Sequence, residues 1–253
     1  MRPISIHPDV DSLAQAAAEH FVSLAGHAVA SRGRFSVALS GGSTPRPTYA
    51  QLATGELSAQ VDWPGVHVFW GDERCVPGDH PDSNYGMVRE TLLDHVPIPE
   101  QNIHPIRGEL EPEQAAAEYE LTLREFFPPA PENPAATFDL VLLGMGADGH
   151  TASLFPRGAV LEEQTRWVVA YYVDEARAWR VTLTPTVINA ATQVTFIVSG
   201  ASKAETVRRV LAGPHQPDLL PAQIIRPAMG CLLWLVDAAA AGNRVGLREN
   251  RTS

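Results

Sequence analysis

The segment that most constrains the fold is residues 138–156, where a short apolar run leads into a glycine-rich polar turn. Residues 138–143 read Phe-Asp-Leu-Val-Leu-Leu, a pattern typical of a buried parallel strand. Glycines at positions 144, 146 and 149 then allow the backbone to turn sharply at the end of this strand, the edge where open α/β sheets bind ligands. The turn carries Asp148 and His150. A histidine beside a carboxylate in such a turn is a candidate general base.

Apolar runs alternate with helical patterns along the whole chain. The predicted strands are residues 35–39, 66–70, 138–143, 167–173, 180–184, 193–198 and 231–236. The predicted helices are residues 11–30, 45–57, 83–94, 112–126, 185–191 and 201–211. This alternation predicts an α/β fold with an open, mostly parallel central sheet and helices on both faces, a Rossmann-like arrangement. Residues 167–173 and 180–184 are close enough in sequence to form an antiparallel hairpin in a mixed sheet.

The domain organisation predicted from the sequence is simple. With 253 residues, 45% of them hydrophobic, the chain can bury one large core, and we expect a single domain over residues 1–253. Residues 128–134 contain four prolines and are interpreted as a loop, not as a domain boundary. The polar segment 242–253 is expected to be a frayed tail.

Charge and hydropathy exclude several classes of partner. The formal net charge of −10 argues against nucleic acid or an anionic membrane as the main partner. No apolar stretch has the roughly 18 residues that a membrane span needs, and Cys75 and Cys231 form no spaced framework. These features predict a cytoplasmic protein, and nothing in them implies an obligate protein partner.

A second strand-to-helix turn is a candidate phosphate site. It follows residues 35–39 and consists of Ser40, Gly41, Gly42, Ser43 and Thr44, with Pro45 opening the next helix. Backbone N–H groups can converge in such a turn, and the helix start adds unpaired donors and a partial positive charge. The structural alternative is an ordinary tight turn, which these residues also permit.

Charged residues follow two further predicted strands. Asp72, Glu73 and Arg74 come after residues 66–70. They form either a solvated loop with an internal ion pair or part of a site. In the second case Arg74 binds an anionic substrate and Asp72 makes polar contacts or transfers a proton. Lys203, the one lysine of the chain, lies in the turn after residues 193–198. There a helix N-terminus disfavours a cation unless an anion is bound.

Arg180, at the start of residues 180–184, is another candidate for an anion site. Taken singly, Lys203 and Arg180 are also explained as surface charges. Residues 79–85 match no usual metal-ligand spacing and are interpreted as a loop and helix cap.

Taken together and in this order, these motifs resemble the 6-phosphogluconolactonase family, which is related to the glucosamine-6-phosphate isomerase/deaminases. The resemblance covers most of the chain. It implies an α/β enzyme that hydrolyses 6-phospho-D-glucono-1,5-lactone in the pentose phosphate pathway, with a phosphosugar lactone as its partner and no metal or organic cofactor. It also implies that His150 is catalytic, that residues 40–44, Arg74, Lys203 and Arg180 surround the substrate, and that Asp72 matches the aspartate base of the deaminases.

The two branches of this family differ just after His150. Deaminase relatives typically continue Gly-His-Ile-Ala-Phe-Asn-Glu-Pro, whereas this chain reads Gly-His-Thr-Ala-Ser-Leu-Phe-Pro over residues 149–156. Phe155 therefore occupies the position of a glutamate that assists sugar ring opening, and a phenyl ring cannot carry a proton. The lactonase prediction is favoured; the alternatives are a deaminase-type enzyme and a non-catalytic sugar-phosphate sensor. Asp148 and Asp72 both remain candidates for orienting the His150 imidazole.

Overall fold

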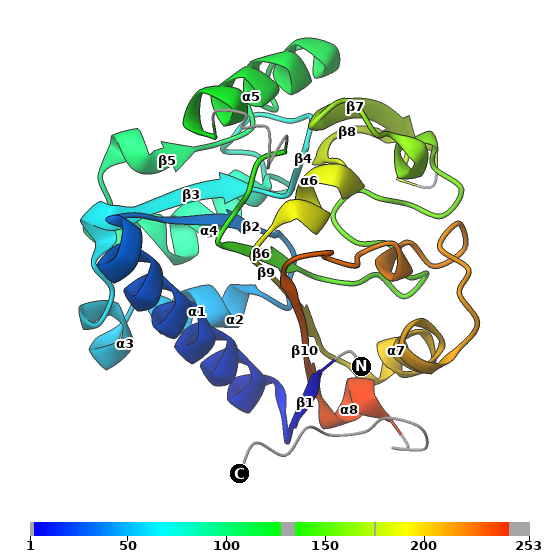
Figure 1. Ribbon diagram of the computed structural model, residues 1–253, viewed down its shortest axis with the longest axis horizontal. Helices are drawn as coiled ribbons and strands as arrows, with labels where there is room; N and C mark the ends of the chain where they lie inside the picture. Colours follow the sequence, from blue (N-terminus) through cyan, green and yellow to red (C-terminus); the bar gives the residue numbers. More distant parts are fainter. Residues whose placement is uncertain (1–2, 128–134, 175, 243–253) are drawn as a thin grey trace.

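Two β-sheets form the framework of the protein (Figure 1). The structure is a computed structural model, and it describes residues 3–127, 135–174 and 176–242. The large sheet has seven strands in the order β1-β10-β9-β6-β2-β3-β5, and every neighbouring pair is parallel. The small sheet has three antiparallel strands in the order β4-β8-β7. The predicted α/β class with a parallel central sheet is confirmed.

The strands of the large sheet are mostly short and apolar, as expected for strands that helices cover on both faces. Every residue of β2, β6 and β9 is buried. The strands of the large sheet are β1 (Ile4–His7), β2 (Phe35–Leu39), β3 (Val66–Trp70), β5 (Ile103–His104), β6 (Leu140–Leu143), β9 (Gln193–Val198) and β10 (Cys231–Asp237). Those of the small sheet are β4 (Asp72–Arg74), β7 (Val168–Val173) and β8 (Ala178–Leu183).

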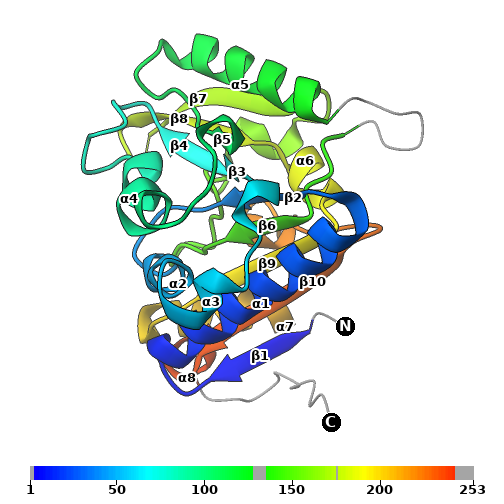
Figure 2. The same cartoon turned by 90° about the vertical axis from the view of Figure 1, so that its left-hand side faces the viewer.

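Helices cover both faces of the large sheet, with α1 and α2 on one side and α6 and α7 on the other (Figure 1). Helix α5 packs against β7 and β8 of the small sheet (Figure 2). The longest helix in the described part of the chain, α1, begins after Asp9, whose side chain caps it by accepting a hydrogen bond from the Ser12 N–H at 2.8 Å. The α-helices are α1 (Val10–Arg32), α2 (Arg46–Leu52), α3 (Gly55–Ala59), α4 (Asn84–Thr91), α5 (Pro112–Phe126), α6 (Pro185–Ala190), α7 (Ala204–Ala212) and α8 (Ala238–Ala241).

The strand order creates a crevice at the carboxyl edge of the large sheet. Strands β2 and β6 are neighbours, but the chain continues from β2 to β3 on one side and from β6 to β9 on the other. The loops that follow β2 and β6 therefore diverge, and a space opens between them.

Some sequence predictions need correction. The 167–173 and 180–184 hairpin exists as β7 and β8, but it pairs with β4 in the separate small sheet and does not join a mixed central sheet. Residues 72–74, expected as a loop or strand-end turn, form β4 because β8 supplies backbone partners. The helix predicted over 45–57 is broken into α2 and α3, since Thr54 is extended and Gly55 has a φ of 62°.

Two of the segments discussed from the sequence lie wholly or almost wholly outside the described residues. The proline-rich segment 128–134 lies outside the described residues, and so does the predicted tail except for Gly242. The assignment of residues 1–253 to one domain stays a prediction. None of the helices in the described part of the chain combines the length and hydrophobicity needed to cross a lipid bilayer.

Candidate active site

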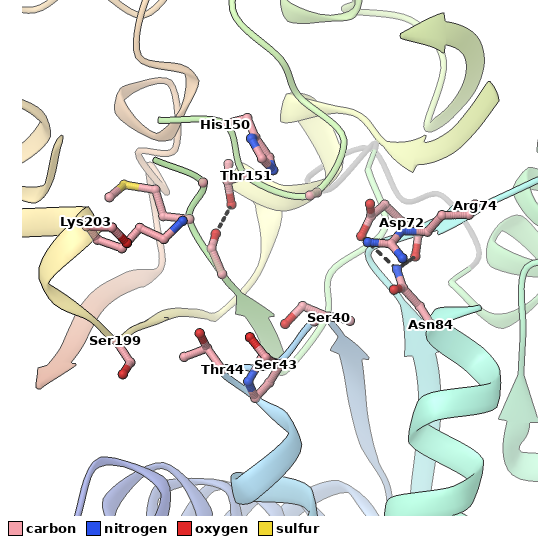
Figure 3. A pocket seen from close by; sticks show the side chains of 18 residues that line it. Ser40, Ser43, Thr44, Asp72, Arg74, Asn84, His150, Thr151, Ser199 and Lys203 are labelled. Atoms are coloured by element: carbon pink, nitrogen blue, oxygen red, sulfur yellow. Dashed lines mark hydrogen bonds between the residues drawn. The ribbon is translucent and has the colours of Figure 1, made fainter. Parts of the chain in front are cut away.

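A pocket of about 400 Å³ lies at the carboxyl edge of the large sheet. The loops after β2, β6 and β9 contribute to it, together with β4 and the start of α4. Figure 3 shows Lys203, Ser199, Ser43 and Thr44 toward one end, and Asp72, Arg74 and Asn84 toward the other. The pocket is lined by Ser40, Gly41, Gly42, Ser43, Thr44, Pro45, Asp72, Arg74, Asn84, Gly144, Met145, Gly146, His150, Thr151, Ala152, Ser199, Ser202 and Lys203.

The loop of residues 40–44 presents donors that the described residues leave unused. The Tyr49 hydroxyl accepts from the Ser40 N–H at 3.1 Å and donates to the Ser40 carbonyl at 2.8 Å, which fixes the start of the loop. The Ser40 hydroxyl is buried and has no hydrogen-bond partner in the described part of the chain. The backbone N–H groups of residues 41–44 likewise donate to no described group. A buried hydroxyl is normally paired, and the N–H groups beside it face the open pocket, so this loop fits an anionic or hydroxyl-rich ligand.

Gly41 is required by a close approach between this loop and α4. A β-carbon at Gly41 would lie 1.7 Å from Oδ1 of Asn84. Any side chain at this position would push the loop away from Asn84, and the pocket wall would open.

His150 and Asp148 form a hydrogen-bonded pair at the turn after β6. The distance between His150 Nδ1 and Asp148 Oδ1 is 2.6 Å, and the Asp148 carboxylate also accepts from the His150 N–H at 3.1 Å. Partial burial acts to raise the pKa of Asp148, but hydrogen bonds and the charge interaction with His150 outweigh it and lower this pKa. Because Nδ1 is engaged, Nε2 is the nitrogen left to exchange a proton, and it has no partner among the described residues.

The turn itself is shaped to hold this pair. A β-carbon at Gly146 would lie 2.2 Å from His150 Nδ1 and 2.5 Å from Asp148 Oδ1, so glycine is needed beneath the two side chains. Gly149 has a φ of 87°, which favours glycine, and the Gly146 N–H donates to the His150 carbonyl at 2.9 Å.

Asp72 lies in β4 and is buried, with its carboxylate held from two sides. The Ser153 hydroxyl donates to Oδ2 at 2.6 Å, and the Asn84 amide is 3.4 Å from Oδ1. The Asn84 amide also donates to the Asp72 carbonyl at 2.8 Å. No described hydrogen bond joins Asp72 to His150, so Asp148 is the carboxylate in contact with the imidazole.

Glu73 fixes the start of α4 from beneath the pocket. Its buried carboxylate accepts from the backbone N–H groups of Asn84 and Tyr85, both at 2.7 Å. Burial raises the pKa of Glu73 to about 7, while these backbone hydrogen bonds act in the opposite direction. Glu73 therefore positions Asn84 without facing the pocket.

Two arginines lie side by side at the β4 end. Arg74 lines the pocket, donates from its guanidinium to the Asp82 carbonyl at 2.6 Å, and has a buried Nε without a described partner. Arg180 is its cross-strand neighbour in β8, but it is not among the residues that line the pocket. Partial burial and then the Arg74 charge lower the pKa of Arg180, while the charges of Asp72 and Asp82 act in the opposite direction.

Lys203 closes the other end of the pocket at the N-terminus of α7. Its ammonium group makes no ion pair or hydrogen bond with any described residue. The preceding turn is held by Asp237, which accepts from the Ser199 hydroxyl at 2.5 Å and from the Gly200 N–H at 3.1 Å. Lys203 lines the same pocket as the free N–H groups of residues 41–44. An unpaired cation together with free backbone donors is an arrangement that binds phosphate.

Comparisons with known proteins identify the family of the chain. A family model described as glucosamine-6-phosphate isomerases/6-phosphogluconolactonase matches residues 8–234. The chain belongs to this family. A 6-phosphogluconolactonase from Nostoc sp. is 44% identical over 94% of this chain and 97% of its own length, and one from Synechocystis sp. is 46% identical over 85% and 87%. The structure of a 6-phosphogluconolactonase from Trypanosoma brucei has a TM-score of 0.84 and 33% identity, covering 95% of this chain and 98% of that one.

Several side chains in the pocket of this family member were absent from the sequence-based prediction. Asn84, Thr151, Ser199 and Ser202 line the pocket, and Ser153 contacts Asp72. Ser199 and Ser202 lie in the predicted turn around Lys203, so that turn was the available signal.

Across the described residues, no group of three or more His, Cys, Asp or Glu side chains is arranged to hold a metal ion.

Proposed function

We propose that this chain hydrolyses 6-phospho-D-glucono-1,5-lactone to 6-phospho-D-gluconate, the lactonase step of the oxidative pentose phosphate pathway. The observation that carries the proposal is one pocket with a carboxylate-oriented histidine, an unpaired lysine and a loop of unused donors. Its close relatives are named as 6-phosphogluconolactonases. The cytoplasm is the compartment expected from the sequence.

In this mechanism His150 acts as the general base. Its Nε2 takes a proton from water while the water oxygen attacks the lactone carbonyl carbon. Unpaired N–H groups of residues 41–44 and the buried Ser40 hydroxyl are the donors available to the oxyanion or to the substrate phosphate. As the bond between the carbonyl carbon and the ring oxygen breaks, protonated His150 returns the proton to that oxygen.

The two ends of the pocket bind different parts of the substrate. Lys203 and residues 40–44 hold the phosphate, while Asp72, Asn84 and Arg74 contact the hydroxyl-bearing part of the sugar. Arg180 adds positive potential from behind Arg74. Binding energy from the phosphate then fixes the lactone relative to His150.

The direct test is hydrolysis of freshly prepared 6-phosphogluconolactone, measured against its spontaneous rate in the first seconds by coupling the product to 6-phosphogluconate dehydrogenase. We expect strong acceleration, and no ammonia from glucosamine 6-phosphate at the same protein concentration. Ammonia release without lactone hydrolysis would overturn the proposal in favour of a deaminase. Binding of both compounds without turnover of either would favour a sugar-phosphate sensor.

A further inference from the structure

Ser153, a buried residue of the loop that carries His150, bonds this loop to the small sheet. Its three polar groups bond to three different strands. The Ser153 hydroxyl donates to Asp72 of β4 at 2.6 Å, and its backbone N–H donates to the Thr182 hydroxyl of β8 at 3.3 Å. Its carbonyl accepts a hydrogen bond from the Tyr171 hydroxyl of β7.

The segment between His150 and Ser153 is tightly turned. The Leu154 N–H donates to the Thr151 carbonyl at 2.9 Å, and Thr151 and Leu154 form an isolated antiparallel bridge. Ala152 has a φ of 46°, in the left-handed region that non-glycine residues rarely adopt. A turn of this shape needs outside contacts to hold it, and Ser153 makes them.

We infer that Ser153 is a positioning residue for lactone hydrolysis: its hydroxyl locks the Asp72 carboxylate to the loop of His150. Asp72 begins β4 two residues after β3 ends, and His150 follows β6, so hydrogen bonds between the His150 loop and β4 help to set their separation across the pocket. The Ser153–Asp72 hydrogen bond is such a contact, it is buried, and it lies three residues from His150. The inference rests on the proposed function.

The chain supplies a matched control. Ser36 is also buried, and its hydroxyl donates to Oδ2 of Asp139 at 2.9 Å. This serine–aspartate pair lies at the opposite, amino-terminal edge of β2 and β6 and does not line the pocket. Ser153→Ala and Ser36→Ala therefore delete the same group from the same kind of hydrogen bond, one beside the site and one away from it.

The experiment measures kcat and KM for the lactone in the wild type, Ser153→Ala, Ser36→Ala, Asp72→Ala and the Ser153→Ala/Asp72→Ala double variant. We expect Ser153→Ala to lower kcat roughly ten- to a hundredfold with a smaller change in KM, because misplacement of reacting groups acts on the chemical step. Ser36→Ala should stay within about twofold of the wild type. The double variant should be no slower than the slower single variant, because Asp72→Ala already removes the acceptor of the Ser153 hydroxyl.

Two results would overturn the inference: kcat of Ser153→Ala equal to that of Ser36→Ala, or losses from Ser153→Ala and Asp72→Ala that multiply in the double variant. Should Ser153→Ala fail to fold, Ser153→Cys keeps the size of the side chain and weakens the donor. It should lower kcat while Ser36→Cys does not, and equal kcat values would again refute the role. The wild-type rate separates the two claims: an inactive wild type overturns the proposed function and this inference together.

Discussion

Phe155 stacks on the imidazole of His150, with ring centroids 4.2 Å apart and ring planes 20° apart. The phenyl ring covers one face of the imidazole, while Asp148 holds its Nδ1 edge. The deaminase pattern from which this sequence departs has a glutamate at the position of Phe155. The His150 imidazole is therefore flanked by an apolar ring instead of a second proton carrier, and this arrangement suits lactone hydrolysis better than sugar isomerisation.

The first prediction concerns His150 itself. His150→Ala should lower kcat by roughly 10²–10⁴ with a smaller change in KM, because it removes the general base. Its side chain is about a third exposed, so the variant should fold. His27→Ala, on the exposed side of α1, is the control and should retain activity. A folded His150→Ala protein with near-native kcat would remove His150 from the mechanism.

Asp148→Asn tests which carboxylate orients the imidazole. An amide can donate a hydrogen bond to Nδ1, which would move the ring proton to Nε2 and disable the base. We expect kcat to fall by roughly 10²–10⁴, with the melting temperature little changed. Steady-state kinetics and a thermal melt check this. A loss of less than threefold would instead point to Asp72 as the orienting group.

Lys203→Ala should raise KM for the phosphorylated lactone roughly ten- to a hundredfold, because it deletes a charge-assisted contact worth about 1.5–3 kcal/mol. Hydrolysis of unphosphorylated glucono-1,5-lactone should hardly change. Arg208→Ala is the control, since Arg208 is an exposed cation on α7 that pairs with Glu205. If both lactones are affected equally, Lys203 is not a phosphate ligand.

The last prediction concerns acid stability and a histidine pair outside the pocket. His67 Nδ1 and His104 Nε2 are 3.3 Å apart. Burial, and then His67, lower the pKa of His104 to about 4, and burial followed by the Arg34 charge lowers the pKa of His67. Because the unfolded histidine has a pKa near 6.5, the unfolded chain binds protons that the folded chain does not.

The stability that neutral His104 contributes is therefore complete above pH 6.5 and is lost as the pH falls toward 4. At pH 5 the loss should be at most about 2 kcal/mol, and solvent access reduces it. Urea unfolding at pH 7.5 and pH 5 should show a larger drop for the wild type than for His104→Gln. The raised pKa of Glu73 has the opposite effect, since it makes the folded protein more stable as the pH falls. Both proteins contain Glu73, so its contribution cancels when their two drops in unfolding free energy are compared. Equal drops would show that His104 does not titrate in this way.

The sequence determined the elements whose conformation is local. The predicted strands 35–39, 66–70 and 193–198 and the helix 112–126 match β2, β3, β9 and α5 residue for residue, because each is an apolar or amphipathic run bounded by turn or cap residues. Parallel strands place their carboxyl ends at one edge, so residues 40–44, Asp72, Arg74, His150 and Lys203 could be expected in one pocket, and they line it together.

Only the tertiary structure decided which of these groups touch. Asp72 and Asp148 were equal candidates in sequence, but Asp148 contacts His150 while Asp72 bonds to Ser153, 81 positions away. Likewise, residues 72–74 became a strand, and Arg180 came to lie behind Arg74, because β8 returns to pair with β4. Local propensity cannot specify such contacts, since strand pairing and buried hydrogen bonds depend on segments that meet only when the whole chain folds.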